Sequence, residues 1–130
     1  KRWVRIGGLL DDESALCAQA SANDGFPVIA VLNEQRHGHV ALVMPGPFAM
    51  ASSWGGHIAP NSASYFLDRP LSAYVSQPLN HAFGRSNALK ASYYYRKKDR
   101  DSPFSPIAMQ LEKRLASQTF ESLFGLNNAP

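Results

Sequence analysis

The sequence contains a single cysteine, Cys17, among its 130 residues. One cysteine cannot form a disulfide within the chain, so the thiol is either a small buried apolar residue or a nucleophile. Long apolar runs are also missing, because none approaches the roughly 20 residues that cross a bilayer. Internal repeats and low-complexity segments are absent as well. We therefore expect a packed domain with no membrane span.

Charge is sparse: 18% of the residues are charged, 45% are hydrophobic, and the formal net charge is +3. A mildly basic chain suits adsorption to anionic polymers such as nucleic acid, teichoic acid or a bacterial wall. Ordinary solvated lysines and arginines explain the same balance equally well.

The length suits one domain with one core, and we expect residues 1–130 to form it. Its core should cover about residues 3–98, and an amphipathic helix of about residues 105–124 should be appended to it. The sequence begins at Lys1 within a strand-like stretch. We therefore expect a trimmed chain, the C-terminal part of a longer one.

The first half of the sequence predicts a helix followed by a hairpin. Residues 2–6 read as an edge strand that Gly7 and Gly8 break, and Asp11 or Asp12 caps a helix that ends near Asn23. Two apolar stretches, residues 26–32 and 40–44, read as buried strands. The polar loop between them predicts an antiparallel hairpin.

The second half predicts more strands and a final helix. Residues 48–54 read as a third strand, and residues 57–80 read as loop-rich sequence with two short apolar pieces, SYFL and SAYV. Residues 89–96 read as a tyrosine-rich strand. Ser105 and Pro106 then start a helix whose apolar stripe is Ile107, Leu111 and Leu115. This order of elements predicts an α+β fold with a central antiparallel sheet and flanking helices.

His37 and His39 are two residues apart and would face the same side of a strand. Three interpretations stay open. The pair binds a metal with Glu34 or His57 as third ligand, it marks a polar strand edge, or His39 is a general base at the end of the sheet.

A longer stretch, AQASANDGFPVIAVLNEQRHGHVALVMPG at residues 18–46, has a distinctive order. Ala-Gln and Ala-Asn-x-Gly precede a Val- and Ala-rich strand, and Gly-His-Val-Ala-x-Val-x-Pro-Gly follows. This order resembles bacterial and phage cell-wall hydrolases of the NlpC/P60 and CHAP type, which are papain-like cysteine peptidases and amidases. The later stretches SSWGGHIAPNSASYF and PLNHAFGRSNALKASYYYRKK resemble the same proteins. The resemblance covers about residues 3–98, the second half of such a domain.

The resemblance implies a papain-like core that hydrolyses amide bonds in peptidoglycan stem peptides by a thiol–histidine mechanism. It implies a secreted or periplasmic protein of bacterial or phage origin, with peptidoglycan or muropeptides as substrate. It implies no metal and no cofactor. A protein inhibitor or a missing N-terminal segment would be its protein partner.

His39 matches the catalytic histidine of that family, where it acts as general base. A third polar residue on the next strand orients the ring, and Ser52 is the nearest position here, with Asn61 and His57 as further candidates. The nucleophile is harder to assign, because Cys17 lies inside its expected helix whereas the family's cysteine opens one. Either Cys17 serves, or the nucleophile lies outside this sequence, or the chain is a binding module. A serine nucleophile is not expected without a Gly-x-Ser-x-Gly elbow.

Aromatic residues suggest where substrate would bind. Trp54 stands beside two glycines, where it either stacks on a sugar or fills the core, and His57 and Asn61 follow on the next loop. We expect these three to contact substrate. A basic and aromatic run, YYYRKK at residues 93–98, is typical of nucleic-acid binders, but no RNP, KH or zinc signature accompanies it. The alternative functions are therefore a cell-wall- or protein-binding module and, as the less expected one, nucleic-acid binding.

Overall fold

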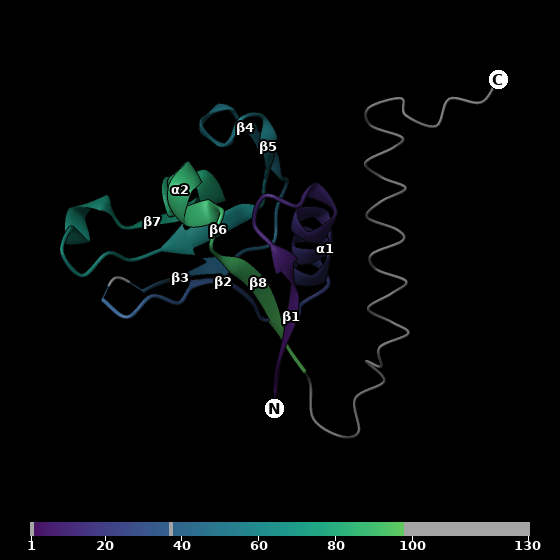
Figure 1. Ribbon diagram of the computed structural model, residues 1–130. Coiled ribbons are helices and arrows are strands. Elements are labelled where there is room, and N and C mark those ends of the chain that lie inside the picture. The colour runs from purple at the N-terminus through teal and green to yellow at the C-terminus, as the bar shows by residue number, and fades with distance from the viewer. Residues whose placement is uncertain (1, 37, 98–130) are drawn as a thin grey trace.

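The fold is that of one helix packed against a twisted antiparallel sheet, as the computed structural model shows for residues 2–36 and 38–97 (Figure 1). The six-stranded sheet has the order β1-β8-β2-β3-β6-β7, with every neighbouring pair antiparallel. The predicted α+β class is thereby confirmed. The expected helix of residues 105–124 and His37 lie outside the described residues.

The elements follow one another closely along the chain. They are β1 (Trp3–Gly8), α1 (Asp12–Asn23), β2 (Val28–Leu32), β3 (His39–Val43), β4 (Ala49–Ala51), η1 (Ser52–Trp54), β5 (His57–Ala59), β6 (Asn61–Ser64), η2 (Pro70–Ser72), β7 (Tyr74–Pro78), η3 (Leu79–His81), α2 (Arg85–Ala88) and β8 (Ser92–Arg96). Strands β4 and β5 form a separate two-stranded sheet that projects beyond the main one (Figure 1). None of the described helices is both long and apolar enough to cross a membrane.

The predicted hairpin is confirmed. Strand β2 pairs with β3 from Val28 opposite Val43 to Leu32 opposite His39. The last described strand, β8, lies between β1 and β2. The β2–β3 hairpin is therefore in the middle of the sheet, and β1 is an edge strand as predicted.

Helix α1 packs closely on β1 because a glycine allows it. A side chain at Gly7 would collide with Ser14 of the helix. The helix begins at Asp12 and ends at Asn23, as the capping residues predicted. Gly7 and Gly8 do not break β1, which continues to Gly8 with a bulge between Arg5 and Gly7.

A buried glutamine attaches the C-terminal half of α1 to the sheet. Gln19 Nε2 donates a hydrogen bond of 2.8 Å to the carbonyl of Met44, and Gln19 Oε1 accepts one of 2.7 Å from the backbone amide of Asn61. Both partners are backbone groups at the ends of strands. This pair of bonds fixes α1 against the point where β3 ends and β6 begins.

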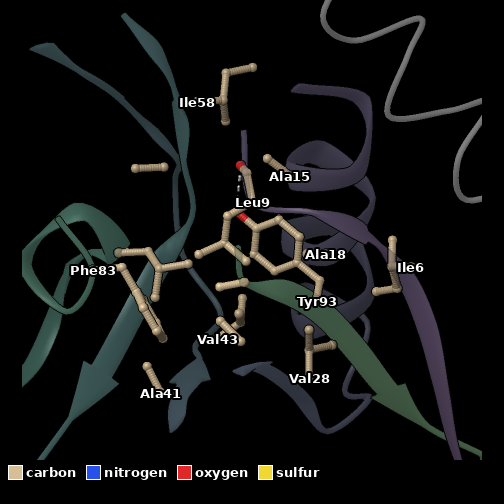
Figure 2. Packing of buried hydrophobic residues seen from close by; sticks show 14 of the residues in the cluster. Ile6, Leu9, Ala15, Ala18, Val28, Ala41, Val43, Ile58, Phe83 and Tyr93 are labelled. Atoms are coloured by element: carbon tan, nitrogen blue, oxygen red, sulfur yellow. Dashed lines mark hydrogen bonds between the residues drawn. The ribbon is translucent and has the colours of Figure 1, made fainter. Parts of the chain in front are cut away.

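The core lies between α1 and one face of the sheet (Figure 2). Tyr93 of β8 is fully buried at its centre, and its hydroxyl donates to the carbonyl of Leu9 at 3.4 Å. Val28, Ala30 and Leu32 alternate along β2 toward this face. Helix α1 buries mostly small side chains (Ala, Ser and Cys), so helix and sheet approach closely.

Three further predictions about strands are wrong. Residues 57–80 are not loop, because β5, β6 and β7 lie there. Residues 48–54 divide into β4 and the 3-10 turn η1. Strand β3 is not buried on both faces, since Val40 and Leu42 are exposed. Strand β6 reads NSAS, and such small polar residues carry little of the β-branched signal by which strands are predicted.

Replacing Gln19 with leucine tests the attachment of α1. The change removes both hydrogen bonds, together with one from Gln19 Nε2 to Asn23 Oδ1 at 3.1 Å. The carbonyl of Met44 and the buried amide of Asn61 then lose their glutamine partner, at about 1–3 kcal/mol each. We expect the free energy of unfolding in urea to fall by about 2–4 kcal/mol. The matched change Glu13→Gln, on the exposed side of the same helix, should alter it by less than about 0.5 kcal/mol. Equal effects of the two changes would contradict this role.

Candidate active site around His39

His39 is the first residue of β3, and its side chain faces the covered side of the sheet. It shares that face with Ala41 and Val43, both buried, and pairs with Leu32 of β2. The histidine itself is only half-buried. It therefore lies at the rim of the core, where a titratable group can contact both protein and substrate.

A serine of the neighbouring strand holds the imidazole ring. His39 Nε2 lies 2.8 Å from Ser64 Oγ at the end of β6. The pairing of Leu42 with Ala63 and of Val43 with Ser62 brings the end of β6 beside the start of β3. Ser64 is itself buried, so the hydroxyl has little freedom to turn toward water.

Two phenylalanines flank the ring. Phe66 stacks on His39 with ring centroids 4.9 Å apart and planes 8° from parallel. Phe83 meets it at 62° with centroids 5.2 Å apart. Both phenylalanines are buried, so they shield these sides of the imidazole from water and fix its plane.

This environment favours the neutral imidazole. Burial lowers the pKa of His39 below 6.5, the Arg69 guanidinium lowers it further, and the Asp68 carboxylate opposes the shift. Arg69 is placed by Phe66, since its guanidinium carbon lies 4.8 Å from the ring centroid. At pH 7 His39 is thus uncharged and able to accept a proton.

The contact with Ser64 also bears on which ring nitrogen takes that proton. When Nε2 carries the hydrogen, it donates to Ser64 Oγ and Nδ1 keeps its lone pair for a nucleophile. When the hydroxyl donates, the roles are reversed. The first arrangement is the one that a general base requires, with Ser64 in the orienting position.

Among the described residues, the serine that contacts the imidazole of His39 is Ser64 and not the expected Ser52. Ser52 begins η1 beyond β4, in the separate hairpin. The sequence pattern predicts loop at residues 61–64, whereas these residues form β6, the strand next to β3 in the sheet. Ser52 is nearer to His39 along the chain, but Ser64 is the serine in contact with it.

Cys17 lies in the middle of α1 and has no exposed surface. It belongs to the core cluster with its neighbours Leu16 and Ala18. A thiolate at this position would be buried among apolar side chains, and a substrate carbonyl could not reach it without opening the core. The structure places Cys17 as a packing residue.

The three residues expected to bind substrate have structural partners. Trp54 is fully buried and its Nε1 donates to the carbonyl of Phe83 at 2.8 Å, so it fills the core and offers no ring face to a sugar. Asn61 is buried and its Nδ2 donates to the carbonyl of Pro45 at 2.9 Å. His57 Nδ1 lies 3.1 Å from Asp12 Oδ1, which ties β5 to the start of α1.

The described residues do not group into a metal site, because no three His, Cys, Asp or Glu side chains gather within residues 2–36 and 38–97. Glu34, a suggested third ligand, forms an ion pair with Lys90 at 2.9 Å. His57, the other suggested ligand, pairs with Asp12.

The tyrosine strand is mostly a core element. Tyr93 and Tyr95 are buried, and Tyr94, on the opposite face, is half-buried. A nucleic-acid surface would therefore have Tyr94 as its one tyrosine from this strand.

The chain matches no protein-family model and no curated protein.

The pKa of His39 should respond to its two charged neighbours in opposite directions. NMR titration of the imidazole should give a pKa below 6.5. Arg69→Gln should raise that pKa, because a repelling cation is lost, and Asp68→Asn should lower it further, because an attracting anion is lost. Arg69→Lys keeps the charge and serves as the matched control. Shifts in the same direction for Arg69→Gln and Asp68→Asn would contradict this electrostatic account.

Proposed function

We propose that this chain carries the general base of a thiol–histidine amide hydrolase that cleaves peptidoglycan stem peptides. The proposal includes a papain-like arrangement of the sheet and helix, and action outside the cytoplasm, where peptidoglycan lies. It combines the resemblance around His39 with the observed antiparallel sheet and the surroundings of that histidine.

One observation carries the proposal. His39 is a half-buried, neutral imidazole whose Nε2 is engaged by Ser64 at 2.8 Å and whose plane is fixed by Phe66 and Phe83. A histidine that only marks a polar strand edge needs neither a fixed plane nor a buried hydroxyl partner. Both features suit a general base, because proton transfer depends on the position of one lone pair.

The reaction follows from this geometry. A thiol gives its proton to Nδ1 of His39, and the thiolate attacks the amide carbonyl carbon. The imidazolium then protonates the departing nitrogen as the C–N bond breaks, which leaves an acyl-enzyme thioester. Water gives a proton to His39 and attacks the thioester, and the released sulfur recovers its proton.

The thiol itself is proposed to come from another polypeptide segment. Cys17 is the single cysteine of the sequence and is fully buried, so it does not offer an accessible sulfur. A thiol facing His39 would then belong to polypeptide beyond these 130 residues, in the same natural protein or in a partner.

The burial of Cys17 also favours a second candidate function, a non-catalytic cell-wall-binding module on the same scaffold. In that case His39 and its neighbours would form a binding surface and no covalent step would occur. Sedimentation with insoluble peptidoglycan separates the two functions: a binding module would sediment and release no peptide.

Substitution of His39 in the natural full-length protein that carries this sequence tests the hydrolase. With muropeptides as substrate and mass spectrometry as readout, His39→Ala should reduce kcat by about 100- to 10,000-fold, because general-base catalysis is lost. Ser64→Ala should reduce it by about tenfold, since a lost orienting hydrogen bond is worth about 1.4 kcal/mol. The hydroxyl-retaining change Ser64→Thr should preserve more activity than Ser64→Ala.

His81→Ala is the matched control, because His81 is exposed and does not contact His39 in the described part of the chain. Its activity should stay at the wild-type level. Full activity of His39→Ala would remove the catalytic role, and no product from the wild-type protein would leave the binding module as the better account. Complete loss of activity in Ser64→Ala, with covalent labelling of Ser64 by a fluorophosphonate, would make Ser64 the nucleophile instead.

A further inference from the structure

The face of the sheet opposite α1 carries a continuous row of side chains across all six strands. The cross-strand register aligns this row as Arg5, Tyr94, Ile29, Leu42, Ala63 and Val75. On the two central strands, Val31 and Val40 form a parallel row beside it. This open face is therefore largely aliphatic from β2 to β7.

The aliphatic half is exposed and hollowed. Val40 is 53% exposed, Leu42 44% and Val75 71%. They line a hollow of about 660 Å³ together with Ile29, Ala63, Ser64, Tyr65, Ala73 and Tyr74. A solvated face of an antiparallel sheet normally carries polar residues, so an aliphatic one indicates a covering partner.

The distribution of charged residues on this face indicates that the partner is apolar. No residue that lines the hollow is charged. The cations of this face, Arg5 and Arg96, lie on β1 and β8 at its other end. An anionic polymer would bind over those two strands, so the hollow over β3 and β6 suits an apolar occupant.

We infer that residues 105–124 of this chain cover the aliphatic half of the open face. Their sequence, SPIAMQLEKRLASQTFESLF, predicts an amphipathic helix with Ile107, Leu111 and Leu115 in one stripe. An apolar stripe over an apolar sheet face is the usual way in which both are removed from water. The inference does not depend on the proposed hydrolase.

The C-terminal end of β8 lies close to the open face, so residues that follow it can reach this face. Arg96 donates its backbone amide to the carbonyl of Pro27 at 2.9 Å, so the chain leaves the sheet beside the start of β2. That point is two residues along β8 from Tyr94, a member of the row described above. The described chain thus ends at the edge of the proposed docking surface.

The lengths of the linker and of the predicted helix also fit the dimensions of the sheet. Residues 98–104 reach at most about 23 Å, whereas β3 lies two strands from β8, about 10 Å away. A helix of 20 residues is about 30 Å long, close to the roughly 24 Å width of a six-stranded sheet. A tethered segment also has an effective concentration in the millimolar range, which favours it over a second copy.

Contacts between methyl groups in the full chain test the inference. NMR should show nuclear Overhauser effects from Leu111 or Leu115 to Val40 or Leu42 that persist on dilution. A soluble gadolinium reagent should broaden the Val40 and Leu42 methyl signals little in the wild-type chain. It should broaden them strongly in Leu111→Asp/Leu115→Asp, because the cover is then lost. The matched variant Glu112→Gln/Lys113→Gln keeps the apolar stripe and should behave as wild type.

Two results would overturn the inference. The same contacts found only between differently labelled molecules in a mixed sample would make the occupant a second copy. Val40 and Leu42 methyl signals that are broadened equally in wild type and Leu111→Asp/Leu115→Asp would show that the segment does not cover this face. The intermolecular contacts and the broadening of the wild-type methyl signals are both measured on the unaltered chain, so strong broadening in wild type counts against the inference whether or not the variants fold.

Discussion

The pairing of β3 with β6 is the constraint on which the candidate site depends. It places Val43 opposite Ser62 and Leu42 opposite Ala63, and so brings Ser64 beside His39. A shift of this register by one residue would move the Ser64 hydroxyl away from His39 and leave the imidazole without its partner. The buried Gln19 supports the register from α1, because it binds the backbone at Met44 and at Asn61.

The two faces of the sheet have different roles in this account. The covered face carries the core and, at its rim, the neutral imidazole of His39. The opposite face is aliphatic over β2, β3, β6 and β7 and is proposed to be covered by residues 105–124. Alternation along β3 separates these roles within a single strand: His39 and Ala41 face the core, and Val40 and Leu42 face the other way.

Periodicity and capping residues predicted the parts of the fold that are apolar and regular. They predicted the bounds of α1 and the existence of the β2–β3 hairpin and the tyrosine strand, because Val, Ile and Tyr mark strands and Asp marks a helix start. The tyrosine strand β8 begins at Ser92, three residues later than the expected start at residue 89. They failed for β6, whose small polar residues and preceding proline resemble loop. For that reason the sequence points to Ser52, which is closer to His39 along the chain, and not to Ser64. For Trp54 and Cys17 the sequence left a core role and a site role open, because either residue type suits both, and the structure shows both residues buried.

Chemical rescue tests the central claim most directly. In the natural full-length protein, His39→Ala leaves a space beside Ser64 and Phe66 where free imidazole can bind. If His39 is the base, added imidazole should restore hydrolysis of muropeptides in His39→Ala and should not affect His81→Ala. Restored rates should follow the concentration of neutral imidazole. An inactive variant that imidazole does not rescue, although NMR shows imidazole bound at that space, would contradict the account.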